Sequence, residues 1–74
     1  MDELTARDRL ASALAFREVE FSRDLADATR AWGASDPGTQ RRARRLAGVR
    51  AAIREGRPLT RAEFSGDDET KAAR

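Results

Sequence analysis

The first 32 residues of this 74-residue chain contain no glycine and no proline, and Gly33 is the first residue to interrupt the run. Large apolar residues and one alanine recur through it at steps of 4, 7, 4, 3 and 4, within about 60° on a helical wheel. They are Leu10, Leu14, Phe21, Leu25, Ala28 and Trp32. This pattern predicts one long amphipathic helix from about Thr5 to Trp32. Thr5 is the expected N-cap, and Gly33 is the expected left-handed residue that ends the helix.

A second helix is predicted from Pro37 to Glu55. Asp36 is a good N-cap, and proline is well tolerated at the first helical position. Gly56 and the proline two residues later predict where the helix stops. Its apolar stripe is short, consisting of Leu46, Val49 and Ile53. Gly48 weakens the helix by about 1 kcal/mol relative to alanine, which suggests that the facing helix comes close there.

The segment Leu59–Phe64 has the signature of a helix start. Thr60 and Glu63 fit a capping box, and Leu59 and Phe64 fit the hydrophobic staple that accompanies it. Ser65-Gly66 follows at once, so this helix is limited to about one turn. We expect Leu59 and Phe64 to fold back over the open end of the hairpin.

The expected fold is all-α. The short loop at 33–38 makes the two long helices antiparallel neighbours. The chain is thus predicted to be a helical hairpin with a short C-terminal helical turn, completed by oligomerisation because so small a domain buries little surface alone. Residues 1–66 are expected to form a single small helical domain, and residues 67–74 a mobile polar tail.

Charge is unevenly distributed along the chain. Residues 41–61 carry eight arginines and one acid, while residues 1–40 and 62–74 are both net acidic. On the wheel, the arginines at the start of the second helix lie away from its apolar stripe, whereas Arg50 and Arg54 border the stripe. The candidate residues for binding a partner or an anion are Arg41, Arg44, Arg45, Arg57 and Arg61.

Two other interpretations of this arginine block remain open. The arginines could pair with acids of the first helix, namely Glu18, Glu20, Asp24 and Asp27. They could also neutralise the phosphates of a nucleic acid, which would make binding depend on salt.

The first helix has a second apolar feature, because Phe16 and Val19 lie nearly opposite its main stripe. A two-helix hairpin cannot bury both faces of one helix, so this pair predicts an assembly interface. The residues expected to take part in assembly are Leu14, Phe16, Val19, Phe21 and Trp32. Two alternatives are that the 59–64 segment packs on Phe16, and that Trp32 only caps the core.

The composition argues against most chemistry. Cysteine and histidine are absent, which removes thiolate chemistry, the commonest general base and the commonest metal ligands. We therefore expect no enzymatic activity, no cofactor, no metal and no small-molecule substrate. No apolar run is long enough to cross a membrane and no secretory signal is evident, so a cytoplasmic protein is expected.

The function predicted from these features is a helical protein–protein interaction module. It would form a homo-oligomer or bind a protein with an acidic surface selected by the arginine-rich face. The alternatives are a nucleic-acid-binding regulator that uses the second helix, and a structural component of a phage or another large assembly.

Overall fold

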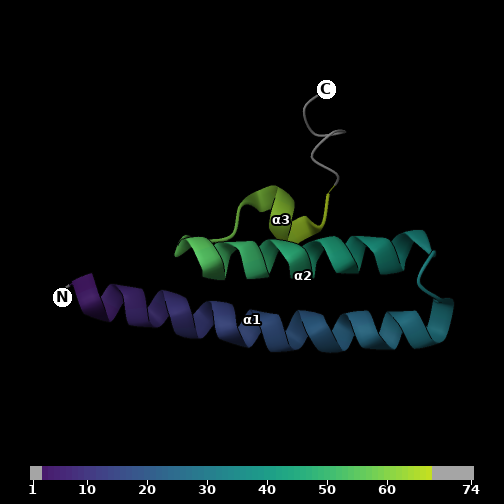
Figure 1. Cartoon of the computed structure of the whole chain (residues 1–74), viewed down its shortest axis with the longest axis horizontal. Helices are drawn as coiled ribbons and strands as arrows, with labels where there is room; N and C mark the ends of the chain where they lie inside the picture. The colour runs from purple at the N-terminus through teal and green to yellow at the C-terminus, as the bar shows by residue number, and fades with distance from the viewer. Residues whose placement is uncertain (1–2, 68–74) are drawn as a thin grey trace, which may run out of the picture.

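The computed structural model describes the backbone of residues 3–67 and the side chains of residues 5–67. It contains three helices in this part of the chain: α1 (Glu3–Trp32), α2 (Pro37–Glu55) and α3 (Arg61–Ser65). The two long helices run antiparallel, and α1 extends beyond the C-terminal end of α2 (Figure 1). The predicted all-α hairpin with a C-terminal turn is confirmed. Of the expected polar tail at 67–74, residues 68–74 lie outside the described residues.

Local signals place the helix ends. Gly33, Gly56 and Gly66 follow the three helices with φ angles of 88°, 65° and 76°, a left-handed conformation that glycine adopts without strain. The Asp36 side chain accepts hydrogen bonds from the backbone of Gly38 and Thr39 at the start of α2. The expectation that Thr5 caps α1 is wrong, because the helix already includes Glu3 and Thr5 lies inside it.

The core is a single layer between α1 and α2. Phe21, Leu46 and Val49 form its centre, with Leu25 and Leu59 packed against them. Thr39 is the one polar residue that is buried in the described part of the chain, and its hydroxyl donates to the carbonyl oxygen of Ala28 at 3.3 Å. The edges of the predicted stripes are less covered, since Trp32 and Ile53 are 59% and 42% exposed. Both lie near an end of the hairpin.

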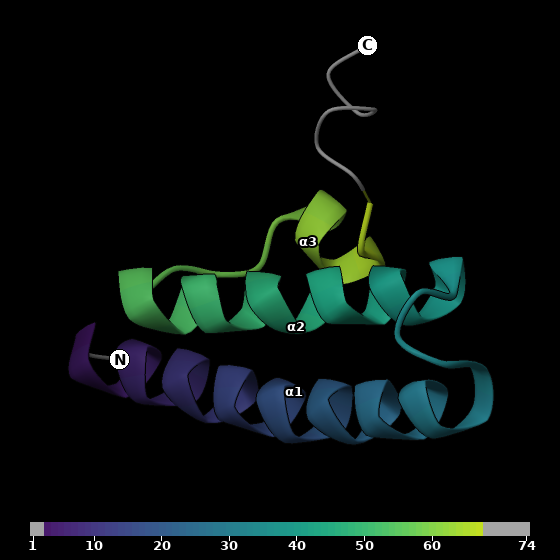
Figure 2. The ribbon, with the colours of Figure 1, turned by 45° about the vertical axis from the view of Figure 1, so that its right-hand side comes forward.

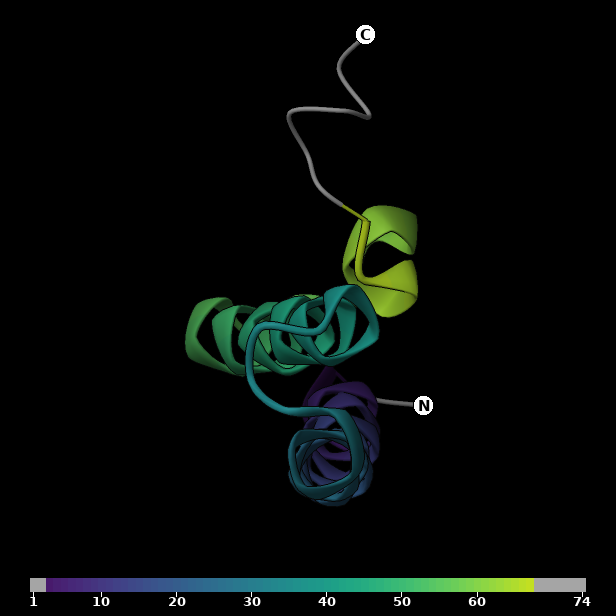
Figure 3. The ribbon, with the colours of Figure 1, turned by 90° about the vertical axis from the view of Figure 1, so that its right-hand side faces the viewer.

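Helix α3 packs against α2 on a side turned away from α1, so that α2 lies between the other two helices (Figures 2 and 3). It sits over the middle of α2 and does not cover the open end of the hairpin, contrary to the sequence-based expectation. Gly48 explains this position. A Cβ atom at Gly48 would lie 2.7 Å from the Cβ of Glu63, so only glycine lets the two backbones approach this closely. A close approach does occur at Gly48, but the prediction that the facing helix α1 makes it is wrong, because the neighbour is α3.

Candidate interaction surface

The capping box of α3 is joined to the end of α2 by an ion pair. The Thr60 hydroxyl accepts from the Glu63 backbone N–H, and the Glu63 carboxylate accepts from the Thr60 backbone N–H at 3.0 Å. The same carboxylate accepts two hydrogen bonds from Arg57, at 2.7 and 2.9 Å. Arg57, and after it the Thr60 backbone N–H, lowers the pKa of Glu63 from 4.5 to about 2. Arg57 therefore has a structural role at the joint between α2 and α3.

Two further arginines fasten α3 along α2. The Nε atom of Arg44 donates to the carbonyl oxygen of Gly66 at 2.8 Å, and the Nε of Arg45 donates to that of Phe64 at 2.9 Å. These carbonyls lie at the C-terminal end of α3, where a helix leaves acceptors without intrahelical partners. The guanidinium of Arg45 also lies 4.0 Å from the centre of the Phe21 ring. Arg45 thus occupies the space between α1 and α3, and does not point outward as the wheel predicted.

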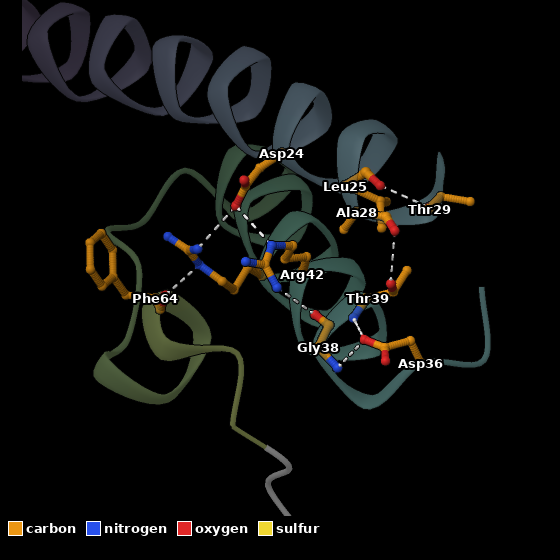
Figure 4. A network of polar contacts seen from close by, with 10 residues as sticks. Asp24, Leu25, Ala28, Thr29, Asp36, Gly38, Thr39, Arg42 and Phe64 are labelled. Carbon is orange, nitrogen blue, oxygen red and sulfur yellow. Dashed lines mark hydrogen bonds and ion pairs between the residues drawn. The ribbon is translucent and has the colours of Figure 1, made fainter. Parts of the chain in front are cut away.

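Acids of α1 hold other arginines of the block. Asp24 forms ion pairs with both Arg42 and Arg45, at 3.3 and 3.5 Å, and Glu18 pairs with Arg50 at 3.2 Å. Figure 4 shows Asp24 facing Arg42 across the two helices. The interpretation of the hairpin as an acidic arm paired with a basic arm is therefore confirmed for Glu18 and Asp24. Glu20 and Asp27 pair instead within α1, with Arg17 and Arg30.

Five of the eight arginines at 41–61 are thus engaged inside the molecule. No hydrogen bond or ion pair within the described part of the chain involves the side chains of Arg41, Arg54 and Arg61. Of the predicted partner-binding residues, only Arg41 and Arg61 have side chains without a hydrogen bond or ion pair to another residue in the range 5–67. The basic surface is smaller than the sequence suggests.

The predicted assembly residues separate into two groups. Leu14 and Phe21 are 5% and 2% exposed, so they belong to the core and are not accessible to a partner. Phe16, Val19 and Trp32 are 66%, 53% and 59% exposed. Trp32 has the Arg42 guanidinium 5.3 Å from its ring centre and lies at the turn of the hairpin, away from the other two.

Phe16 and Val19 form what we call the outer face of α1, on the side of this helix opposite the core. A shallow groove of about 490 Å³ extends from these two residues around α1 toward α2. It is lined also by Glu20, Phe21, Arg23, Asp24, Asp27 and the α2 residue Arg45. The alternative that α3 covers Phe16 is wrong. Phe64 instead places its ring against Phe21, and the guanidinium of Arg17 lies 5.3 Å from the centre of the Phe64 ring.

Comparisons of the whole chain with protein-family models, with curated proteins and with solved structures find no match. Among the side chains of residues 5–67 the structure has no group of three or more acidic residues arranged to hold a metal ion. None of the helices described is long and apolar enough to span a membrane. The candidate functional site is therefore defined by its geometry alone.

Proposed function

We propose that this chain is a helical interaction module that binds another protein surface through Phe16 and Val19. The observation that carries the proposal is the exposure of these two apolar side chains, 66% and 53%, on a helix whose opposite face forms the core. Each Å² of apolar surface removed from water contributes about 25 cal/mol, so a partner that covers them gains free energy.

The segment that follows α2 supports this proposal, because its large apolar side chains already have packing partners. Leu59 packs on the core cluster and Phe64 packs on Phe21, so the only segment that follows α2 in the described chain is engaged elsewhere. Within the described residues, Phe16 and Val19 remain largely exposed. Such adjacent apolar residues on one helix face are typical of a surface that another helix covers.

The strength of the contact follows from its size. Full burial of a Phe or Val side chain contributes about 1.5–3 kcal/mol, whereas association costs at least about 4 kcal/mol in lost freedom of motion. Two such side chains from each partner are enough for a moderate or weak complex. We therefore propose a reversible complex, whose extent of formation depends on protein concentration, and not a permanent assembly.

Three arginines of the 41–61 block have no side-chain hydrogen bond or ion pair within the described residues: Arg41, Arg54 and Arg61. They would favour a partner with an acidic surface, mainly by raising the rate of association. A nucleic-acid-binding role has weaker support, since five of the eight arginines in the block already have partners within the chain. Phosphate binding would weaken steeply with added salt, whereas binding through Phe16 and Val19 would not.

Photocrosslinking in cells that express the chain tests the proposed function. A photoreactive phenylalanine analogue in place of Ser12 lies beside Phe16 on the outer face of α1, and the same analogue in place of Arg54 on α2 is the matched control. We expect a defined crosslinked product from position 12, lost with Phe16→Asp, and none from position 54. Absence of any product at position 12 contradicts the proposal. A role inside a larger assembly would appear as a product with another component.

A further inference from the structure

The outer face of α1 extends well beyond Phe16 and Val19. Residues on this face recur at alternating steps of four and three, the spacing of a coiled-coil seam. The seam consists of Ser12, Phe16, Val19, Arg23, Ala26 and Arg30. All six are exposed, and both α2 and α3 lie on other sides of α1 (Figure 3). A second helix could therefore lie along the seam without displacing any part of the described chain.

The apolar pair lies at the centre of the helix. α1 runs from Glu3 to Trp32, so its midpoint falls between residues 17 and 18, which is also the midpoint between Phe16 and Val19. A two-fold axis through this point aligns two antiparallel copies of α1 over their whole length. It places Phe16 of each copy opposite Val19 of the other, as an isologous interface requires.

The charged residues on and beside the seam match in the same register. Two-fold symmetry brings the same edge of both helices together, so Arg9 of one copy lies beside Asp27 of the second copy, and Asp8 lies within reach of Arg30 of the second copy. In the single chain Asp27 and Arg30 pair with each other. Their side chains are 69% and 77% exposed, so both remain accessible to a second copy. Asp8 and Arg9 are exposed and have no ion pair within the described part of the chain.

A parallel arrangement of the two copies would bring like charges together. In register, it would set Arg9, Arg23 and Arg30 of one copy beside the same residues of the other, and like charges at such positions repel. We infer that the partner bound by the outer face of α1 is a second copy of this chain, packed antiparallel about the centre of α1. This inference rests on the proposed function. The experiments below distinguish a failure of the inference from a failure of the proposed function.

Sedimentation equilibrium of the full chain over a range of concentrations tests self-association. We expect a reversible monomer–dimer equilibrium, weakened at least about a hundredfold by Phe16→Asp. Asp27→Arg should weaken the dimer about tenfold through its two symmetric ion pairs, and the double variant with Arg9→Asp should restore it. Because Phe16, Arg9 and Asp27 are exposed, circular dichroism should show these variants folded. A chain that stays monomeric up to millimolar concentration overturns the inference.

Disulfide trapping tests the orientation, and the chain suits it because it has no cysteine. Ser12→Cys and Arg23→Cys lie opposite each other in the antiparallel register. An equal mixture of the two single variants should therefore form mixed disulfides faster than either variant forms its own. Arg54→Cys is the matched control on α2 and should not join the mixed product. Preferential Ser12→Cys self-disulfides would indicate a parallel pair and overturn the antiparallel arrangement.

The crosslink formed in cells at position 12 distinguishes a failure of the proposed function from a failure of the second-copy inference. A product with the mass of two copies supports the second copy as the partner. A product that contains only a different protein keeps the proposed function and overturns the second-copy inference. No product at all removes both.

Discussion

The ring of Phe64 meets the ring of Phe21 edge to face, with their centroids 6.1 Å apart and their planes at 62°. This contact joins the last short helix to the first long one across the side of α2. It gives α3 a link to the core, although α3 has only five residues. Since an isolated helix of this length is not stable in water, α3 depends on this contact and on the hydrogen bonds from α2.

Replacing Phe64 by alanine should therefore lower the free energy of unfolding by about 2 kcal/mol. This is less than for a fully buried ring, because Phe64 is 44% exposed. Urea denaturation followed by circular dichroism measures the change. Phe16→Ala in dilute solution is the matched control and should change stability by less than about 0.5 kcal/mol. Equal losses for the two variants would contradict the packing of α3 described above.

Glu63→Gln should destabilise the chain by about 1 kcal/mol near neutral pH, because it removes the ion pair with Arg57 and weakens the capping box. The pKa of Glu63 is lowered from 4.5 to about 2 in the folded chain, so its stabilisation is complete above pH 4.5 and is lost as the pH falls toward 2. The difference between the native chain and Glu63→Gln should disappear over the same interval. Unfolding curves at several pH values measure it, with Glu55→Gln, which removes only the second ion pair of Arg57, as the comparison. A difference that stays constant down to pH 2 would rule out this role of Glu63.

Gly48→Ala should destabilise the chain, although alanine stabilises an ordinary helix by about 1 kcal/mol relative to glycine. The added methyl group would lie 2.7 Å from the Cβ of Glu63, and α3 would have to move away from α2. The midpoint of thermal unfolding is the measurement. The same change in a chain shortened to residues 1–58 lacks the clash and should increase helicity. A higher midpoint for Gly48→Ala in the full chain would show that α3 does not need this close approach.

Arg45→Gln should lower the free energy of unfolding more than Arg41→Gln does, although each substitution removes one positive charge from the same helix. Arg45 donates to the Phe64 carbonyl, pairs with Asp24 and covers the Phe21 ring. Its loss should reduce the free energy of unfolding by about 1–2 kcal/mol. Arg41 has no such contacts within the described residues, and its replacement should stay within about 0.5 kcal/mol. Chemical denaturation of both variants makes the comparison, and similar values would mean that the contacts of Arg45 contribute little.

Much of the candidate site could not be predicted from the sequence. A helical wheel shows which side of its own helix a residue occupies, but not which other segment lies on that side. Arg44 and Arg45 were expected to point outward because their wheel positions are away from Leu46 and Val49, yet α3 occupies that side. Phe16 and Val19 were identified correctly as a second apolar pair, because nothing later in the described chain lies over them.

The sequence by itself determined the helices and their ends. Gly33, Asp36-Pro37, Gly56 and the Thr60/Glu63 box act within a few residues, through the allowed backbone angles and local hydrogen bonds, so they can be read without tertiary information. Only the tertiary structure decided where α3 packs and which arginines remain available. Those contacts join residues 19 to 43 positions apart, such as Arg45 with Phe64 and Phe21 with Phe64, and depend on a cleft that only glycine at position 48 leaves open.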